Sequence, residues 1–146
     1  MLKLDSKCCS VSQASQIQKE ENGKVFRIIN GTKRKIVACK VDGCLIDDGS
    51  LKCDFLFIID ETSCEEIALV ELKGTAHVHA LRQIITTAER LDLKKKKCKK
   101  SCFIVSSPSP KTATVYQAEL KKLQSRFNAV GLDLPIKKNN LVEISI

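Results

Sequence analysis

The sequence predicts a single α/β domain with a mixed central β-sheet flanked by helices. From residue 24 to residue 73, apolar residues recur with the two-residue period of strands. After Gly74 the period becomes that of an amphipathic helix, and an apolar run at 102–107 precedes a second helical pattern. The length of 146 residues suits one domain. No stretch approaches the ~18 apolar residues that a membrane span requires, so we expect no membrane partner.

Segment 1–23 has the weakest pattern. It is rich in Ser and Gln, and Ser10 is a suitable N-cap for a short helix over 11–21. Further along, the runs VFRII and KRKIVACKVDGCLI flank Asn30-Gly31. Because Asn-Gly accepts the positive φ angles of a two-residue turn, these runs predict a β-hairpin.

Two further strands follow the predicted hairpin. The turn DDGS at 47–50 leads into CDFLFIID, and after a polar loop the run IALVELK ends at Lys73. Residues 24–73 therefore predict a four-strand antiparallel meander. Two of its strands are apolar on both faces, which is typical of central strands.

Helical patterns and short strands make up the remainder. The run CFIVSS predicts a buried strand that Pro108 ends, and Gly131 can end the second helix in a left-handed cap. The tail LPIKKNNLVEISI fits a final hairpin. The apolar positions at helical spacing are Val78, Leu81, Ile84 or Ile85, Ala88 and Leu91 in the first helix, and Tyr116, Leu120, Leu123, Phe127 and Val130 in the second.

The net charge of +8 is distributed unevenly. Residues 1–73 carry 11 Lys/Arg and 12 Asp/Glu, a net charge of −1, whereas residues 74–146 carry 14 and 5, a net charge of +9. A basic domain of this size attracts polyanions, of which nucleic acid is the commonest. With five Phe, one Tyr and no Trp, the chain offers few aromatic rings for stacking unpaired bases. We therefore expect double-stranded or branched DNA as the partner.

A lysine run, KKKKCKK, separates the first helix from the strand at 102–107. One interpretation is a solvated loop, where lysines suit the negative pole of the preceding helix. The other is a patch that holds the phosphate backbone beside an active site, joined by the lysines at 121, 122, 137 and 138. The candidate nucleic-acid-binding residues are Lys94, Lys95, Lys96, Lys97, Lys99 and Lys100.

Eight cysteines raise the question of disulfides or metal. The start MLKLDSKCCSVSQ lacks the apolar core of a signal peptide, which predicts a reducing, cytoplasmic location. The cysteine spacings do not follow a paired zinc pattern. Cys39 and Cys102 occupy positions typical of small apolar residues in strands, so we expect buried structural thiols. A cysteine-based zinc or redox module is the alternative.

Asp54, Glu71 and Lys73 form the candidate site. Glu71 and Lys73 are two apart in a strand and therefore point to the same side. If the strand that begins at Asp54 pairs with this one, the two carboxylates converge and repel unless a cation joins them. Hard oxygen ligands suit Mg²⁺ or Mn²⁺, which can activate a phosphodiester and the attacking water. Lys73 is then placed to stabilise the charge of the pentavalent phosphate.

An acid followed two residues later by lysine is a weak signal on its own. Among such triplets here, only Glu71-Lys73 ends an apolar strand and precedes a glycine and an amphipathic helix. The alternative is a surface ion pair that contributes less than about 1 kcal/mol.

These residues resemble the core of the PD-(D/E)XK nuclease superfamily, which includes restriction endonucleases and archaeal-type Holliday junction resolvases. The resemblance covers residues 24–107 and implies a restriction endonuclease-like fold with β-β-β-α-β order. It also implies that Asp54 and Glu71 bind the metal with the carbonyl of Leu72, and that Lys73 is catalytic.

Gln83 matches the glutamine that many members carry on the helix after the active-site strand. Two departures accompany the resemblance. Cys53 replaces the proline that names the motif, and Thr87 stands where one branch has a tyrosine. For the acid that many members have on a first helix, Glu20 and Glu21 are the candidates.

The resulting hypothesis is a Mg²⁺- or Mn²⁺-dependent endonuclease that hydrolyses phosphodiester bonds in DNA. A homodimer is the expected assembly, because a two-fold axis would place two active sites on two strands. The alternative is a catalytically inactive, nucleic-acid-binding subunit of a restriction or defence complex that keeps the fold.

Overall fold

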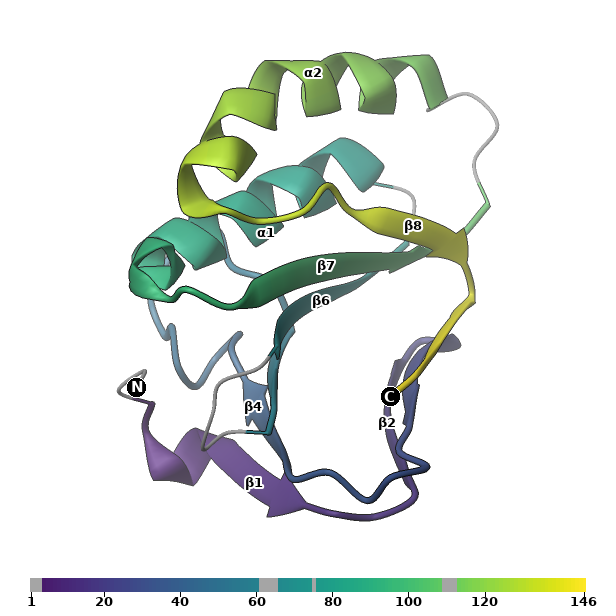
Figure 1. Ribbon diagram of the computed structural model, residues 1–146. Helices are drawn as coiled ribbons and strands as arrows, with labels where there is room; N and C mark the ends of the chain where they lie inside the picture. The colour runs from purple at the N-terminus through teal and green to yellow at the C-terminus, as the bar shows by residue number, and fades with distance from the viewer. Residues whose placement is uncertain (1–3, 61–65, 75, 109–112) are drawn as a thin grey trace.

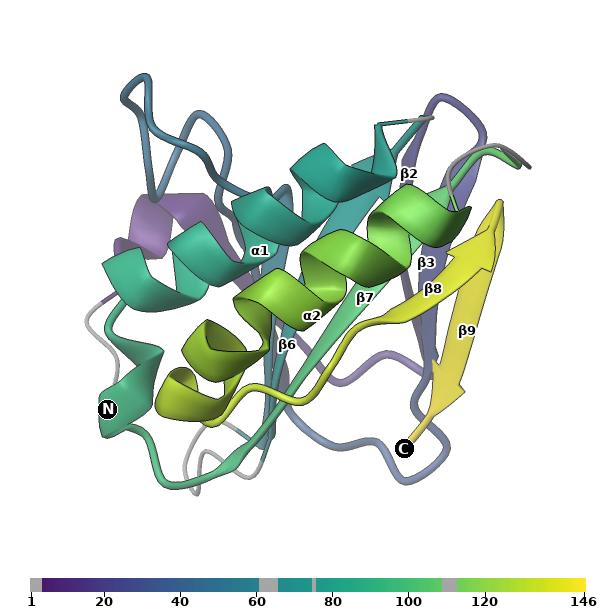
Figure 2. The ribbon, with the colours of Figure 1, turned by 90° about the horizontal axis from the view of Figure 1, so that it is seen from above.

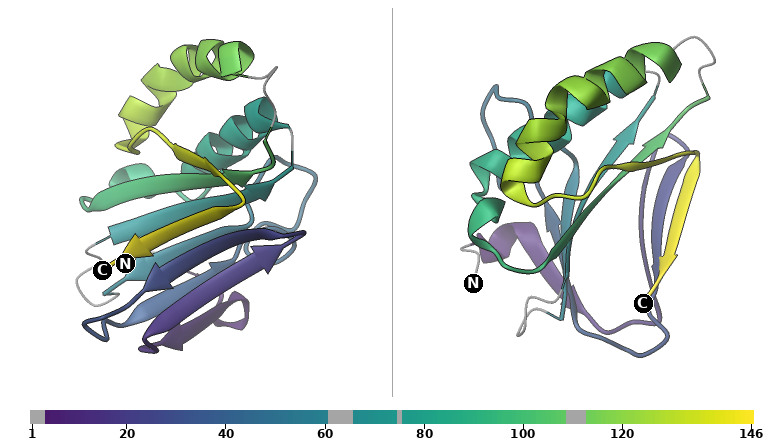
Figure 3. Two further views of the ribbon diagram at one scale, coloured as in Figure 1. Left: turned by 90° about the vertical axis from the view of Figure 1, so that its right-hand side faces the viewer. Right: turned by 45° about the horizontal axis from the view of Figure 1, so that its top comes forward.

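The computed structural model describes residues 4–60, 66–74, 76–108 and 113–146. The elements form three layers: two α-helices, a six-stranded mixed sheet and a three-stranded sheet (Figures 1 and 3). The predicted mixed α/β architecture is confirmed. The second sheet was not expected.

The six-stranded sheet has the order β1-β4-β5-β6-β7-β8. Its pairs are antiparallel from β1 to β6, whereas β6, β7 and β8 run parallel. Both faces of β6 are covered, because Ile67 and Leu69 enter the core under the helices and Ala68 and Val70 enter the core under the second sheet. The strands are β1 Cys9–Ser12, β4 Ile36–Lys40, β5 Phe55–Ile59, β6 Glu66–Lys73, β7 Lys99–Ser106 and β8 Ile136–Asn139.

Two helices, α1 (His77–Arg90) and α2 (Ala113–Val130), lie side by side across one face of this sheet (Figure 2). After α2 the chain turns through Gly131, whose φ is +76°, as the left-handed cap prediction requires. The Leu132 N–H donates to the Phe127 carbonyl at 3.0 Å and completes this cap. Short 3₁₀ turns lie at Ser6–Cys8 and Leu93–Lys95. Among the described residues, no helix is both long and apolar enough to cross a membrane.

The second sheet covers the opposite face. It contains β2 (Gln16–Glu21), β3 (Lys24–Ile29) and β9 (Leu141–Ser145), with β3 in the middle. Phe26 of β3 packs between Phe57 and Phe103 of the large sheet, with ring centroids 5.3 and 5.1 Å away. The aromatic contact joins the two sheets over the central strands.

The N-terminal predictions were wrong in two respects. Residues 11–21, expected to be helical, contain the end of β1 and all of β2, and β3 pairs with β2 and β9 instead of beginning the meander. The tight hairpin forms at Asn22-Gly23, with φ angles of 51° and 77°, and not at Asn30-Gly31. Both sites read Asn-Gly, so the local sequence did not distinguish between them.

Asn30 instead fixes the crossing from one sheet to the other. Its buried side chain donates to the carbonyls of Ala14 and Arg34 at 3.1 and 2.8 Å, and it accepts the Arg34 N–H at 2.8 Å. These bonds satisfy the amide group in a place that water does not reach. The remaining β4-β5-β6 part of the meander is antiparallel, as predicted.

The predicted C-terminal hairpin is also absent, because β8 joins the large sheet and β9 joins the small one. Asn140 lies between them with a φ of 62°. Its N–H donates to Ser106 at 2.9 Å and its carbonyl accepts the Val25 N–H at 2.9 Å. The turn therefore connects the two sheets.

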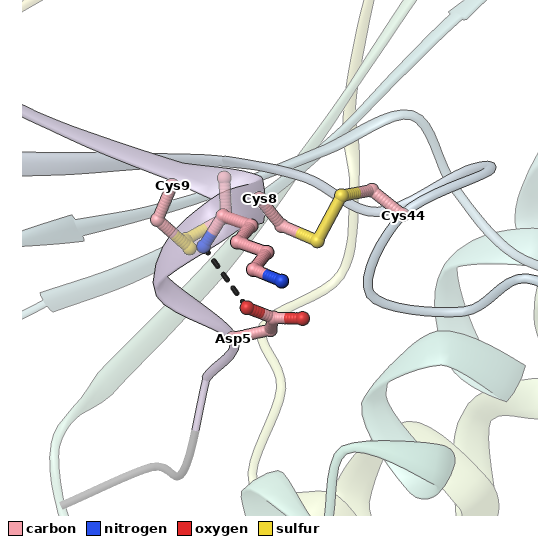
Figure 4. Close-up of a disulfide and its surroundings, with 6 residues drawn as sticks. Asp5, Cys8, Cys9 and Cys44 are labelled. Atoms are coloured by element: carbon pink, nitrogen blue, oxygen red, sulfur yellow. Dashed lines mark hydrogen bonds between the residues drawn. A yellow bond between two sulfur atoms is a disulfide. The ribbon is translucent and has the colours of Figure 1, made fainter.

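Two disulfides tie the N-terminal segment to β4 and the loop after it. Figure 4 shows the Cys8–Cys44 bond, and the second bond joins Cys9 to Cys39. The thiol prediction was wrong for these four cysteines. Cys9 and Cys39 face each other across β1 and β4, 30 residues apart in sequence, a pairing that a helix at 11–21 would not have produced. The cytoplasmic location, which was inferred from the start of the sequence, stays a prediction. Cys64 lies outside the described residues.

Cys53 and Cys102 are buried thiols, as expected. Burial raises the pKa of both groups, so each stays protonated at neutral pH. Among the described residues, no group of three or more His, Cys, Asp or Glu side chains gathers to bind a metal.

Candidate functional site

The antiparallel register of β5 and β6 brings Asp54 opposite Glu71. Phe55 pairs with Val70, and the Asp54 N–H donates to the Val70 carbonyl at 3.1 Å. The Asp54 carboxylate accepts the N–H of Leu72 at 2.8 Å and lies in hydrogen-bonding reach of the Glu71 carboxyl. The convergence that the sequence suggested is therefore present.

Glu71 is nearly inaccessible to solvent, with 2% of its surface exposed. Burial raises its pKa to about 9, and the neighbouring Asp54 charge adds to this effect, while Lys73 opposes it. Burial likewise raises the pKa of Asp54. A buried carboxyl group in contact with a half-buried one disfavours ionisation of both unless something positive joins them, so the pair has affinity for a proton or a cation.

Oxygen atoms without partners indicate where such a cation could bind. Oε1 of Glu71 is buried and accepts no hydrogen bond in the structure. Mg²⁺ is commonly held by one or two carboxylates, with water in its other positions, so this carboxyl pair fits the ion. Asp54 and Glu71 would be the protein ligands. Leu72 presents its N–H to Asp54, and its carbonyl as a third ligand remains a prediction.

Lys73 is half-buried at the end of β6 and lies on the same side of the sheet as Glu71, two residues away. It lowers the pKa of Glu71 through its charge, so the ammonium acts on the carboxyl pair. The Lys73 charge also lowers the pKa of the exposed His79, after the effect of desolvation. The positive charge of Lys73 therefore acts on both the carboxyl pair and the start of α1.

Gln83 connects α1 to the segment that immediately precedes Asp54. Its Nε2 donates to the Lys52 carbonyl at 2.9 Å, two residues before Asp54, and its Oε1 is buried without a partner. Because Nε2 is held by Lys52, Oε1 is presented as an acceptor. Gln83 thus lies next to the strand that carries the first acid.

Two further acids influence Asp54. Glu21, at the tip of the β2–β3 hairpin, and Asp42, in the loop after β4, both raise the pKa of Asp54 by charge repulsion. Glu21 was a candidate from the sequence, but it lies on a hairpin and not on a first helix. Both side chains are exposed. They extend the negative potential from the buried pair to the surface.

The lysine run is not beside this site. In the parallel β6–β7 pair, Lys99 is aligned with Glu66, whereas Lys73 is aligned with Ser106. The five residues from Glu66 to Glu71 correspond to roughly 17 Å along the strand. The expectation that the run holds phosphate next to the carboxylates is corrected, because the two features lie at opposite ends of β6.

Lys100 is buried and does not belong to a surface patch. Its Nζ donates to the carbonyls of Leu93, Lys96 and Val130 at 2.9, 2.6 and 2.9 Å. All three ammonium protons are used within the protein, so the phosphate-contacting role predicted for Lys100 is not compatible with this geometry. Lys94, Lys96, Lys97 and Lys99 line an open hollow of about 630 Å³ at the end of α2, and all but the half-buried Lys96 are exposed. Lys95 is also exposed, but its ammonium pairs with Asp92 at 2.8 Å.

Thr87 is the residue whose role the sequence reasoning missed. It appeared only as a missing tyrosine, yet its buried hydroxyl accepts the Cys53 N–H at 2.8 Å and donates to the Gln83 carbonyl at 2.7 Å. Its spacing of four residues from Gln83 places both on one face of α1 and was the available signal.

Comparisons with known proteins found no matching family model, no matching curated protein and no matching solved structure.

Proposed function

We propose that this chain is a Mg²⁺- or Mn²⁺-dependent endonuclease that hydrolyses phosphodiester bonds in DNA. The observation that carries the proposal is the buried contact between Asp54 and Glu71, with an unpartnered Glu71 oxygen and with Lys73 on the same side of the sheet. A surface ion pair between Glu71 and Lys73 would leave the carboxylate in water, whereas Glu71 is nearly inaccessible to solvent.

The order of elements around the site supports the same proposal. Antiparallel strands β4, β5 and β6 are followed by α1 and then by β7 parallel to β6. This is the β-β-β-α-β order implied by the resemblance to PD-(D/E)XK nucleases. We propose a restriction endonuclease-like core, extended here by β1, β8 and the second sheet.

Each residue has a distinct role in the proposed reaction. Asp54 and Glu71 hold the cation, which when bound polarises the phosphodiester and lowers the pKa of the attacking water. Lys73 directs its positive charge to the phosphate, where negative charge increases as the fifth oxygen approaches. Gln83 provides an acceptor oxygen that can orient a water molecule.

The lysine run contributes binding and not chemistry in this proposal. Its exposed ammonium groups can contact the phosphate backbone without reading bases, at a distance from the bond that is cut. This separation fits a double-stranded or branched DNA substrate that extends over several base pairs. The second candidate function is a catalytically inactive, DNA-binding subunit. Such a subunit would also keep the exposed lysine run.

The test is cleavage of supercoiled and branched DNA in Mg²⁺, in Mn²⁺ and in chelator. We expect cutting only with metal, and a loss of at least about a hundredfold in Glu71→Gln and in Lys73→Ala, because the first removes a ligand of the cation and the second removes the charge directed at the phosphate. Glu66→Gln at the other end of β6 and Lys33→Ala on the surface are the matched controls.

Equal cutting by the wild type and both site variants would contradict the endonuclease proposal. Metal-independent, salt-sensitive binding with no cutting would favour the inactive DNA-binding subunit.

A further inference from the structure

A short segment in front of Asp54 is held by two α1 residues that are one helical turn apart. Gln83 donates to the Lys52 carbonyl at 2.9 Å, and Thr87 accepts the Cys53 N–H at 2.8 Å. The Thr87 hydroxyl in turn donates to the Gln83 carbonyl at 2.7 Å, which fixes its direction. We call Gln83 and Thr87 the α1 clamp.

The hydrogen bond between Thr87 and Cys53 is buried, so water cannot take the place of either partner. Cys53 and Thr87 both have 0% of their surface exposed. A buried N–H that loses its acceptor costs roughly 1–3 kcal/mol, so the main chain at Cys53 is strongly held in this position.

Asp54 follows the clamped segment directly and continues the constraint. Its carbonyl accepts the Val41 N–H at 2.9 Å, its N–H donates to Val70 at 3.1 Å, and its carboxylate accepts the Leu72 N–H at 2.8 Å. The carboxylate is thus positioned by the hydrogen bonds of the Asp54 main chain. One residue earlier, the bond from the Cys53 N–H to Thr87 holds the same segment.

We infer that Thr87 is a positioning residue that keeps the Asp54 carboxyl against Glu71 by holding the Cys53 amide. This inference rests on the proposed function, since it assigns Thr87 a part in forming the cation site. It also gives the two departures from the resemblance a common physical reason. A proline at position 53 has no N–H, so the Thr87 bond requires a residue such as Cys53.

The test compares variants that differ only in the proposed contact. Thr87→Val keeps the shape of the side chain but removes the acceptor, whereas Thr87→Ser keeps the hydroxyl. Cys53→Pro removes the N–H, whereas Cys53→Ala keeps it and removes only the thiol. Hydrogen exchange at the Leu72 amide reports the position of Asp54 without any metal, and exchange at Leu69 in mid-β6 corrects for global unfolding.

We expect Leu72 protection to fall at least about tenfold relative to Leu69 in Thr87→Val, and to stay within about threefold of wild type in Thr87→Ser. Mn²⁺ affinity measured by calorimetry should fall about 10- to 100-fold in Thr87→Val, as is usual when a group that orients a metal ligand is lost. Cys53→Pro should resemble Thr87→Val, and adding it to Thr87→Val should have little further effect.

The readouts separate the two proposals. Unchanged Leu72 protection in Thr87→Val would overturn the positioning role, whatever the metal affinity. A fall in both Thr87→Val and Thr87→Ser would also overturn it, because the hydroxyl would then not be the operative group. If Leu72 responds as expected while wild type binds neither Mg²⁺ nor Mn²⁺, the clamp is supported and the proposed function fails.

Discussion

The two ends of β6 place acids and lysines in different environments. At the end of the strand, Glu71 is 2% exposed and in contact with Asp54, and its pKa is raised to about 9. At the beginning, Glu66 faces the lysine run and lies 3.8 Å from Lys99, whose side chain is largely exposed. Both ends contain acids and lysines, but among the described residues two acids meet away from solvent only at the end that carries Glu71.

This difference determines what each end can do. Burial perturbs the Asp54–Glu71 pair because desolvation disfavours two negative charges, which creates affinity for a cation. The exposed lysines at the other end are screened by salt and keep their solvation, so they can provide binding but little chemistry. Lys100 is the exception at that end, because it is buried under three carbonyls.

The largest expected difference between the two ends is that Glu71 makes the free energy of unfolding depend on pH. Its pKa is higher in the folded protein than in the unfolded chain, so the folded state binds more protons between pH ~5 and ~9. The stabilisation is complete at the acid side of this window and is lost as pH rises. The free energy of unfolding should fall by up to about 1.4 kcal/mol per pH unit, and by several kcal/mol overall.

Urea unfolding at several pH values in chelator measures this slope. Glu71→Gln should flatten it, whereas Glu66→Gln, at the other end of β6, should not. Adding Mg²⁺ at pH 8 should restore stability to the wild type, because a cation takes the place of the shared proton. A slope that persists in Glu71→Gln would show that another group is responsible.

The second prediction concerns Lys100, whose side chain is buried. Lys100→Met should lower the free energy of unfolding by about 2–4 kcal/mol, since it leaves three carbonyls without their shared donor. Lys97→Met, three residues earlier on the surface, should change it by less than about 0.5 kcal/mol. Thermal and urea unfolding of the two variants provide the measurement, and equal stabilities would refute the structural role of Lys100.

The smallest expected effect is on DNA affinity at the exposed end. Lys94→Gln with Lys97→Gln should reduce the salt dependence of binding, lowering the slope of log K against log salt by about 2 if each residue contacts one phosphate. Lys7→Gln with Lys33→Gln removes the same charge elsewhere. If both pairs alter the slope equally, the lysine run has no special place in DNA binding.

Local patterns in the sequence were sufficient for the elements near the candidate site. The change of period after Gly74 marked α1, and the apolar runs marked β5, β6 and β7, because each reflects burial on a known face. The resulting strand alternation placed Glu71 and Lys73 together. It also led to the expectation that Asp54 lies close to Glu71 if their strands pair, and the β5–β6 register satisfies this condition.

Partners distant in the chain were not predictable in this way. The second sheet joins β2, β3 and β9, so that Val25 pairs with Leu141, and nothing in the VFRII run indicates a partner more than a hundred residues away. The same holds for the Cys9–Cys39 disulfide, which depends on β1 being a strand. The contact from Thr87 to Cys53 likewise requires α1 to cross over the beginning of β5.

By itself, the sequence determined which segments are strands and helices in the core and which acids and lysines could do chemistry, because periodicity and residue type are local properties. The tertiary structure decided where those charges lie. It buried Glu71 against Asp54, used Lys100 to bind three carbonyls and placed the other lysines of the run at the far end of β6. The physical reason is that desolvation and charge interactions depend on distances in space, which the register of non-adjacent strands sets and composition does not.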